Sequence, residues 1–204
     1  MLKQKNNSRR GFTIIEVVLV LAIAGLIFLM VFLALPALQR SQRDTERRNK
    51  LGEFRTQVVQ YQSNNRGRVP GSLEEWQRVV DNYMNLSMTE DGGMAYEEED
   101  KDKIPFQDPT GEPYYIAYYC DLSDKENAKA VGDDSKDLCQ GNTVNSDGGV
   151  STSSLNWDDN KYQIYAFKRG RCDGENVAYQ EKDSDRLVAF VVKLEGSGAY
   201  CGEN

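Results

Sequence analysis

The pattern of apolar and polar positions divides the chain into a membrane-type run, an amphipathic run and a mixed remainder. Between Phe12 and Leu38 nearly every side chain is apolar, and Glu16 is the only ionisable one. At about 1.5 Å per residue, a helix over this run is long enough to cross a hydrocarbon core of about 30 Å. The pattern therefore predicts a transmembrane helix over residues 12–38.

The helical pattern continues after this run in amphipathic form. Apolar residues recur on one helix face at spacings of three, four and three, at Leu51, Phe54, Val58 and Tyr61. We therefore predict one helix from about Phe12 to Gln62, whose second half, residues 39–62, lies under a soluble domain. Within the helix, Gly25 permits close approach of another helix, and Pro36 removes one backbone hydrogen bond and is expected to kink or loosen it.

The remainder, residues 63–204, predicts a globular head with a short helix and several strands. A capping box, in which Ser72 caps and Glu75 reaches back, starts a helix over about residues 72–85. Residues 87–112 are predicted to be a loop, and strands are predicted over residues 112–121, 161–169 and 186–195. The expected fold class is α+β, with an antiparallel sheet of three or four strands lying across the second half of the long helix.

Charge and composition restrict the function. The chain has 204 residues and no histidine, which removes Ser–His and Cys–His catalysis and histidine metal ligands. The net charge of −7 becomes −11 without residues 1–11, whereas residues 40–62 carry +3 and the chain from Ser63 onward carries −13. An acidic head disfavours nucleic acid as its partner. A basic stem under it suits contacts between packed copies, and a solvated acidic surface is the simpler alternative.

Four cysteines lie beyond the membrane-type run, at Cys120, Cys139, Cys172 and Cys201. An even number in an exported domain indicates two disulfides, and the absence of a C-x-x-C pair disfavours a zinc site. Four cysteines allow three connectivities. We favour Cys120–Cys139, across the long excursion of residues 122–160, together with Cys172–Cys201.

The segment Arg10-Gly11-Phe12-Thr13-Ile14-Ile15-Glu16 resembles the class III signal of type IV prepilins and type II secretion pseudopilins. In that family a membrane peptidase cuts after the glycine, the new terminal phenylalanine is N-methylated, and the glutamate is kept for assembly. The resemblance implies removal of residues 1–11 as a leader, N-methylation at Phe12 and an assembly role for Glu16. The family's usual helix proline comes somewhat earlier than Pro36, so the place where the helix bends is open.

The resemblance also implies a pilin-like fold and a structural function. The chain would sit in the cell membrane as a single-pass protein with a cytoplasmic N-terminus. It would then polymerise into an extracellular or periplasm-facing filament for adhesion, twitching motility or DNA uptake. Its partners would be other copies and related pilins, the prepilin peptidase and methyltransferase, and an assembly platform with a separate ATPase. A neighbouring copy's Glu16 would neutralise the new amine of Phe12, so a lone subunit would carry an unpaired charge in lipid.

Other functions stay open at this point. A pseudopilin of a type II secretion machine has the same N-terminus, and a membrane-anchored binding protein that never polymerises would keep its N-terminus intact. No catalytic pair is evident, so we expect no enzyme and no cofactor. Acidic loops at residues 133–137 and 145–149 offer oxygen ligands for calcium, which some pseudopilins bind in this region, as the resemblance implies. Neither loop has EF-hand spacing, so solvated loops are the preferred interpretation.

Overall fold

The structure is a computed structural model, and it describes residues 11–88, 94–95, 106–122, 149–155, 157, 162–180, 184–196 and 198–204. Side chains are not described for residues 73, 95 and 117–121. The chain divides into two compact units, one up to Ser41 and one from Gln42 to Asn204.

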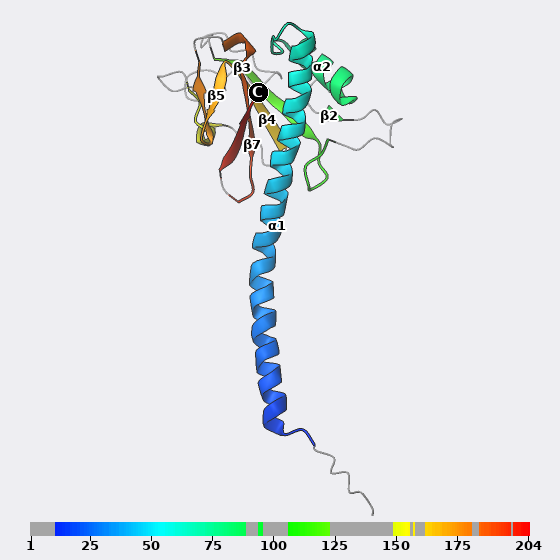
Figure 1. Cartoon of the computed structure of the whole chain (residues 1–204), viewed down its shortest axis with the longest axis vertical. Helices are drawn as coiled ribbons and strands as arrows, with labels where there is room; N and C mark the ends of the chain where they lie inside the picture. The colour runs from blue at the N-terminus through cyan, green and yellow to red at the C-terminus, as the bar shows by residue number, and fades with distance from the viewer. Residues whose placement is uncertain are drawn as a thin grey trace, which may run out of the picture. The chain divides into compact units, whose positions relative to one another are not determined.

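The first unit consists of the helix α1 and the segment before it. Helix α1 runs from Ile14 to Asn64 (Figure 1). Its first 28 residues belong to this unit. The prediction of one helix over about residues 12–62 is therefore confirmed to within two residues at each end. The large apolar side chains from Phe12 to Leu38 are all between 44% and 91% exposed, so no other part of the described chain buries them.

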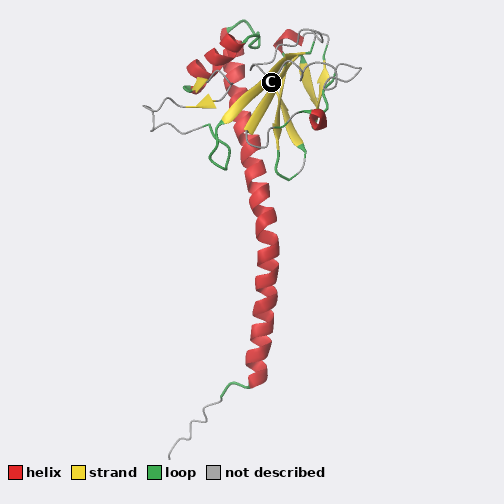
Figure 2. Cartoon of the chain, turned by 180° about the vertical axis from the view of Figure 1, so that it is seen from behind, coloured by secondary structure: helices red, strands yellow, loops and turns green. Residues whose placement is uncertain are grey.

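The second unit is organised around a four-stranded sheet with the strand order β3-β4-β7-β8. Its strands are β3 (Tyr114–Asp121), β4 (Tyr162–Lys168), β7 (Val188–Lys193) and β8 (Ala199–Glu203), seen from behind in Figure 2. The three strands predicted from the sequence are β3, β4 and β7. Strand β8 is a further member of the sheet, which agrees with the upper limit of four.

One pairing in this sheet differs from the prediction. Strands β4–β7 and β7–β8 are antiparallel as expected, but β3 and β4 are parallel, so the sheet is mixed. A parallel pair requires a crossover of a dozen or more residues. The long excursion of residues 122–161 between these strands is such a connection, whereas a hairpin would have forced an antiparallel pair.

Each face of the sheet supports its own apolar core, because successive strand residues point to opposite faces. Leu51, Phe54, Val58 and Tyr61 form the apolar stripe of α1. On one face of the sheet, Ile164, Phe190 and Val192 pack with this stripe and with Trp76. On the other face, Tyr165 and Phe167 pack with a second cluster, which contains Leu122, Val150, Leu155, Val177, Ala189, Val191, Ala199 and Cys201. The strand predicted over residues 161–169 is therefore confirmed, and both of its faces are buried.

Smaller elements complete the head. The predicted helix after Ser72 is present as α2 (Leu73–Val79), which continues as the π-helix η1 (Val80–Met84). The predicted loop after it contains two short antiparallel strands, β1 (Ser87–Met88) and β2 (Met94–Ala95), so that prediction is wrong in part. A hairpin of β5 (Gly170–Asp173) and β6 (Asn176–Tyr179) was not predicted, nor were the 3-10 turns η2 (Thr152–Ser154) and η3 (Ser184–Arg186).

Candidate assembly site

The peptide bond between Gly11 and Phe12 lies before the helix begins. Residues 11–13 have no regular structure, and α1 starts at Ile14. Gly11 is exposed, and apart from its chain neighbours no described atom lies within 4 Å of the position that a Cβ would take there. The bond that the motif marks for cleavage is therefore exposed and free of helical hydrogen bonds, as a protease substrate must be.

Glu16 forms a capping box with Thr13. The backbone amide and the hydroxyl of Thr13 both donate to Oε2 of Glu16, at 2.9 Å each, and the amide of Glu16 lies 3.4 Å from the Thr13 hydroxyl oxygen. A carboxylate in the first helical turn also faces the positive end of the helix dipole. The carboxylate is therefore hydrogen-bonded within its own chain, but Thr13 carries no charge, so the expectation that Glu16 finds its countercharge in another copy stays a prediction.

Gly25 and Pro36 lie in the exposed part of α1. Apart from the backbone of its own helix and its chain neighbours, no described atom lies within 4 Å of the Cβ position at Gly25. Its proposed role in helix packing would need another molecule. Helix α1 is continuous through Pro36, which has no amide hydrogen to donate. The lost hydrogen bond is thus tolerated without ending the helix, and the kink remains a prediction.

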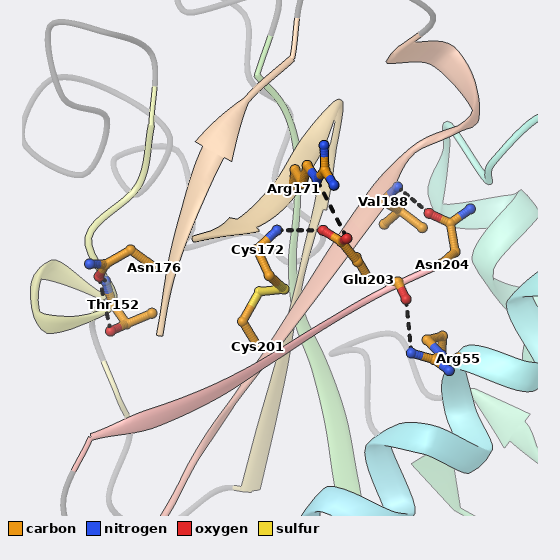
Figure 3. Close-up of a disulfide and its surroundings, with 9 residues drawn as sticks. All are labelled: Arg55, Thr152, Arg171, Cys172, Asn176, Val188, Cys201, Glu203 and Asn204. Carbon is orange, nitrogen blue, oxygen red and sulfur yellow. Dashed lines mark hydrogen bonds and ion pairs between the residues drawn. A yellow bond between two sulfur atoms is a disulfide. The ribbon is translucent and has the colours of Figure 1, made fainter. Parts of the chain in front are cut away.

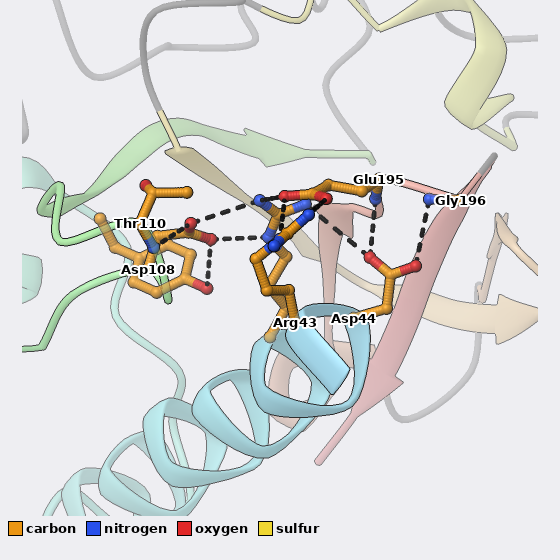
Figure 4. Close-up of polar contacts among 8 residues, drawn as sticks. Arg43, Asp44, Asp108, Thr110, Glu195 and Gly196 are labelled. Atoms are coloured by element: carbon orange, nitrogen blue, oxygen red, sulfur yellow. Dashed lines mark hydrogen bonds and ion pairs between the residues drawn. The ribbon is translucent and has the colours of Figure 1, made fainter. Parts of the chain in front are cut away.

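In the second unit, a set of charged side chains joins α1 to two loops of the head (Figure 4). We call it the Arg47 cluster, and its members are Arg43, Asp44, Arg47, Asp108 and Glu195. Three of them lie on α1 within two helical turns. Asp108 precedes β3, and Glu195 follows β7, so the cluster connects segments that are 61 to 152 residues apart.

Arg47 is at the centre of this cluster and is 4% exposed. Its Nε lies 2.6 Å from Oδ2 of Asp108, and its Nη2 lies 3.0 Å from Oε1 of Glu195. Burial disfavours the charged guanidinium, but the hydrogen bond and charge of Asp108 and the charge of Glu195 outweigh it, so the pKa of Arg47 lies above its ordinary value. Burial and the charge of Asp108 also raise the pKa of Tyr114, whose hydroxyl lies 3.4 Å from Asp108.

The outer members of the cluster hold the loop between β7 and β8. Arg43 binds both carboxylate oxygens of Glu195, at 2.9 Å from Nε and 2.7 Å from Nη2. The carboxylate of Asp44 accepts hydrogen bonds from the amides of Glu195, at 2.7 Å, and Gly196, at 3.1 Å. This arrangement fixes α1 against the head at residues 43–47.

One of the two favoured disulfides is present and fastens the β5–β6 hairpin to β8 (Figure 3). Cys172 and Cys201 are bonded, with their Cα atoms 5.7 Å apart. Beside this bond, the amide of Cys172 donates to the carboxylate of Glu203 at 2.7 Å, and Nη1 of Arg55 donates to the Glu203 carbonyl oxygen at 2.9 Å. The disulfide and the Cys172 amide therefore connect the hairpin to β8, and the Arg55 hydrogen bond connects β8 to α1.

Several predicted features lie outside the described residues. The Cys120 side chain and Cys139 are among them, so the pairing of these two cysteines stays a prediction. The acidic loop at residues 133–137 and all but Gly149 of the loop at 145–149 also lie outside. Within the described ranges, no group of three or more acidic or cysteine side chains could hold a metal ion.

Gly11, Phe12 and Glu16 were predicted from the sequence, whereas Thr13 as the partner of Glu16 and the Arg47 cluster were not. The signal for the first was the spacing Thr13-x-x-Glu16, which is that of a capping box. The signal for the second was Arg47 itself, which lies four residues before Leu51 and thus in phase with the apolar stripe of α1.

Comparison with known proteins adds one finding. Residues 6–32 match the prokaryotic N-terminal methylation motif, and the matched segment contains Gly11, Phe12, Thr13 and Glu16. No curated protein and no solved structure matches the chain. Helix α1, in which a window of 18 residues has a mean hydropathy of 3.2, is long and apolar enough to cross a membrane.

Proposed function

We propose that this chain is the precursor of a filament subunit. The proposal starts from residues 6–32, which are the class III signal segment found in type IV pilins and pseudopilins. A prepilin peptidase cuts it between Gly11 and Phe12, and the new terminal amine is N-methylated. The mature chain polymerises with other copies and related pilins into an extracellular filament. The subunit is structural and performs no catalysis of its own.

The exposure of the first part of α1 carries this proposal. Nineteen large apolar side chains from Phe12 to Leu38 have no cover from the described chain. Burying each of them is worth roughly 1.5–3 kcal/mol, so leaving them in water would cost on the order of tens of kcal/mol. Lipid can supply the cover before assembly, and helices of other copies can supply it afterwards. The methylation motif on the same run favours this transfer from lipid to a filament over a permanent membrane anchor.

The depth of Glu16 in the bilayer fits such a role. From Val17 to Leu38 there are 22 residues, and a helix of that length spans about 33 Å, close to the hydrocarbon thickness of about 30 Å. Glu16 then lies at the cytoplasmic boundary, where the amine of Phe12 also appears after the cut. At 4 Å and an effective dielectric constant near 20, this pair of charges gains about 4 kcal/mol. In an array of copies each carboxylate meets an amine of a neighbour.

The chain requires other proteins for the remaining steps. It carries no G-x-x-x-x-G-K-[ST] sequence for binding nucleotide phosphates, so the energy for assembly comes from a separate ATPase at a membrane platform. The peptidase and methyltransferase act on the cytoplasmic side, where Lys3, Lys5, Arg9 and Arg10 keep the N-terminus by the positive-inside rule.

The test is the Glu16→Ala variant of the full chain. We expect it to be cut and methylated and to stay in the membrane without forming filaments, because the neighbour's amine has lost its countercharge. Glu53→Ala is the matched control, because Glu53 is an exposed glutamate on the same helix, with 57% of its side chain accessible. Mass spectrometry of the mature chain reports the cut, and the amount of protein sheared from the cell surface reports assembly.

Three results would contradict the proposal. A mature chain that begins at Met1 would show a membrane-anchored protein that is never processed. Normal filaments from the Glu16→Ala variant would remove the assembly role of the carboxylate. A processed protein that never appears in the sheared fraction would assign the chain to the pseudopilins of a secretion machine instead of to surface filaments.

A further inference from the structure

We infer that Thr13 is a positioning residue for assembly, because it holds the Glu16 carboxylate in the orientation that receives the amine of another copy. This inference rests on the proposed function and assigns it one further residue. The motif comparison places Thr13 inside the matched segment but gives it no role. The role follows from the hydrogen bonds of the capping box.

The two oxygens of the Glu16 carboxylate have different surroundings. Both Thr13 donors, the amide and the hydroxyl, converge on Oε2 at 2.9 Å. Within the part of the chain that the structure describes, Oε1 has no hydrogen-bond partner. One side of the carboxylate is thus fixed to its own helix, and the other side is available to a donor from outside.

This arrangement lowers the cost of pairing with a second copy. A free glutamate side chain loses rotamer freedom when it is immobilised at an interface. The Thr13 bonds impose that order before the partner arrives, so the partner's amine meets a carboxylate that is already oriented. They also supply two hydrogen bonds to the carboxylate from its own chain.

The hydroxyl of Thr13 is the part that can be removed selectively. Cleavage between Gly11 and Phe12 leaves the amide of Thr13 intact, so the capping box persists in the mature chain. Valine has nearly the shape of threonine but cannot donate to Oε2 or accept from the Glu16 amide. Serine keeps both functions of the hydroxyl. The pair of variants separates the hydrogen bonds from the bulk of the side chain.

The experiment compares Thr13→Val, Thr13→Ser and Glu16→Gln in the full chain, with assembly expressed per processed subunit. Thr56→Val is the matched control, because the Thr56 hydroxyl also lies on α1 and donates to a backbone carbonyl, that of Gly52, at 2.9 Å. We expect all variants to be cut after Gly11. Thr13→Val should reduce sheared filament by about tenfold or more, the effect of one hydrogen bond to a charged group, whereas Thr13→Ser and Thr56→Val should stay within about threefold of the wild type.

The outcomes separate this inference from the proposed function. If Thr13→Val assembles normally while Glu16→Gln does not, Thr13 has no positioning role and the proposed function stands. If Thr13→Ser fails as badly as Thr13→Val, the hydroxyl is not responsible and the inference is wrong. A Thr13→Val chain that is never cut would also overturn it, because the role assigned to Thr13 begins after the cut. Normal filaments from Glu16→Gln would overturn both.

Discussion

At the scale of single residues, the stability of the head depends on a buried arginine that faces several acids. Arg47 contacts three carboxylates, those of Asp44 at 3.8 Å, Asp108 at 2.6 Å and Glu195 at 3.0 Å. The Asp108 side chain is wholly inaccessible to solvent. Removing the cation would therefore leave the buried charge of Asp108 without a countercharge, which costs far more than the loss of an exposed ion pair.

Arg47→Met should lower the free energy of unfolding of the head by roughly 3–5 kcal/mol. Urea denaturation of the full chain in detergent, followed by tryptophan fluorescence, measures this change. The matched control is Arg68→Met, because Arg68 is 72% exposed and lies 3.9 Å from Glu75, and such pairs are worth about 1 kcal/mol or less.

Adding Asp108→Asn to Arg47→Met tests the reason for that loss. Asparagine keeps the size of the aspartate but carries no charge, so the double variant should regain part of the stability lost by Arg47→Met alone. If the losses in the free energy of unfolding from the two substitutions simply added, the buried charge would not be the cause of the loss. The packing of the arginine stem would then be the cause.

At the scale of elements, the sequence predicted what periodicity determines. The long helix and strands β3, β4 and β7 have apolar patterns of sufficient length to be recognised. Strands β5, β6 and β8 have only four or five residues, and β5 and β8 contain glycine, so their patterns are too short to distinguish from loops. The direction of β3 relative to β4 was missed because alternation of apolar residues is the same in parallel and antiparallel strands.

The candidate site was predicted to the extent that it is local in sequence. Gly11, Phe12 and Glu16 lie within one short motif. The Arg47 cluster joins residues up to 152 positions apart, and its acids resemble solvated loop charges until the fold brings them to α1. Only one feature of the sequence indicated that Arg47 is buried, namely its position on the same helix face as the apolar stripe of α1.

The disulfide between β5 and β8 gives a prediction at this scale. It closes a loop with a sequence separation of 29 residues, for which loop-closure entropy predicts a stabilisation of roughly 3.5 kcal/mol. The double variant Cys172→Ala with Cys201→Ala should lose about this amount in urea denaturation. Hydrogen exchange should rise most in the β5–β6 hairpin, while β4, at the centre of the sheet, stays protected.

A matched variant shows whether the covalent bond or the neighbouring polar contact holds the hairpin. Glu203→Gln keeps the disulfide and weakens the hydrogen bond to the Cys172 amide. Its effect should be about 1 kcal/mol or less. If Glu203→Gln released the hairpin as fully as the cysteine variant, the disulfide would not be the main constraint.

At the scale of the whole molecule, the core and the proposed assembly segment come from separate parts of the chain. Every buried residue of the described structure lies at Arg47 or later, and the first unit ends at Ser41. Within the described residues, the buried core and the complete Arg47 cluster therefore both belong to the second unit.

A fragment of residues 42–204, exported to an oxidising compartment, should fold as a soluble monomer. Its melting temperature should lie within a few degrees of that of the head in the full chain. A fragment of residues 48–204 is the control, since it lacks Arg43, Asp44 and Arg47 but keeps the apolar stripe. At about 2–4 °C per kcal/mol, it should melt roughly 10 °C lower. Equal melting temperatures would show that the cluster does not stabilise the head.

The place of β7 and β8 in the sheet has a consequence for the order of synthesis. Leu51, Phe54 and Val58 emerge from the ribosome more than 120 residues before the strand that contains Phe190, with which Phe54 makes an edge-to-face contact at 5.3 Å. If the head is exported as we propose, the apolar stripe of α1 lacks the part of its cover that β7 supplies until residues 188–204 have crossed the bilayer. We expect a chain arrested in this interval to be cut by proteases faster than the complete chain.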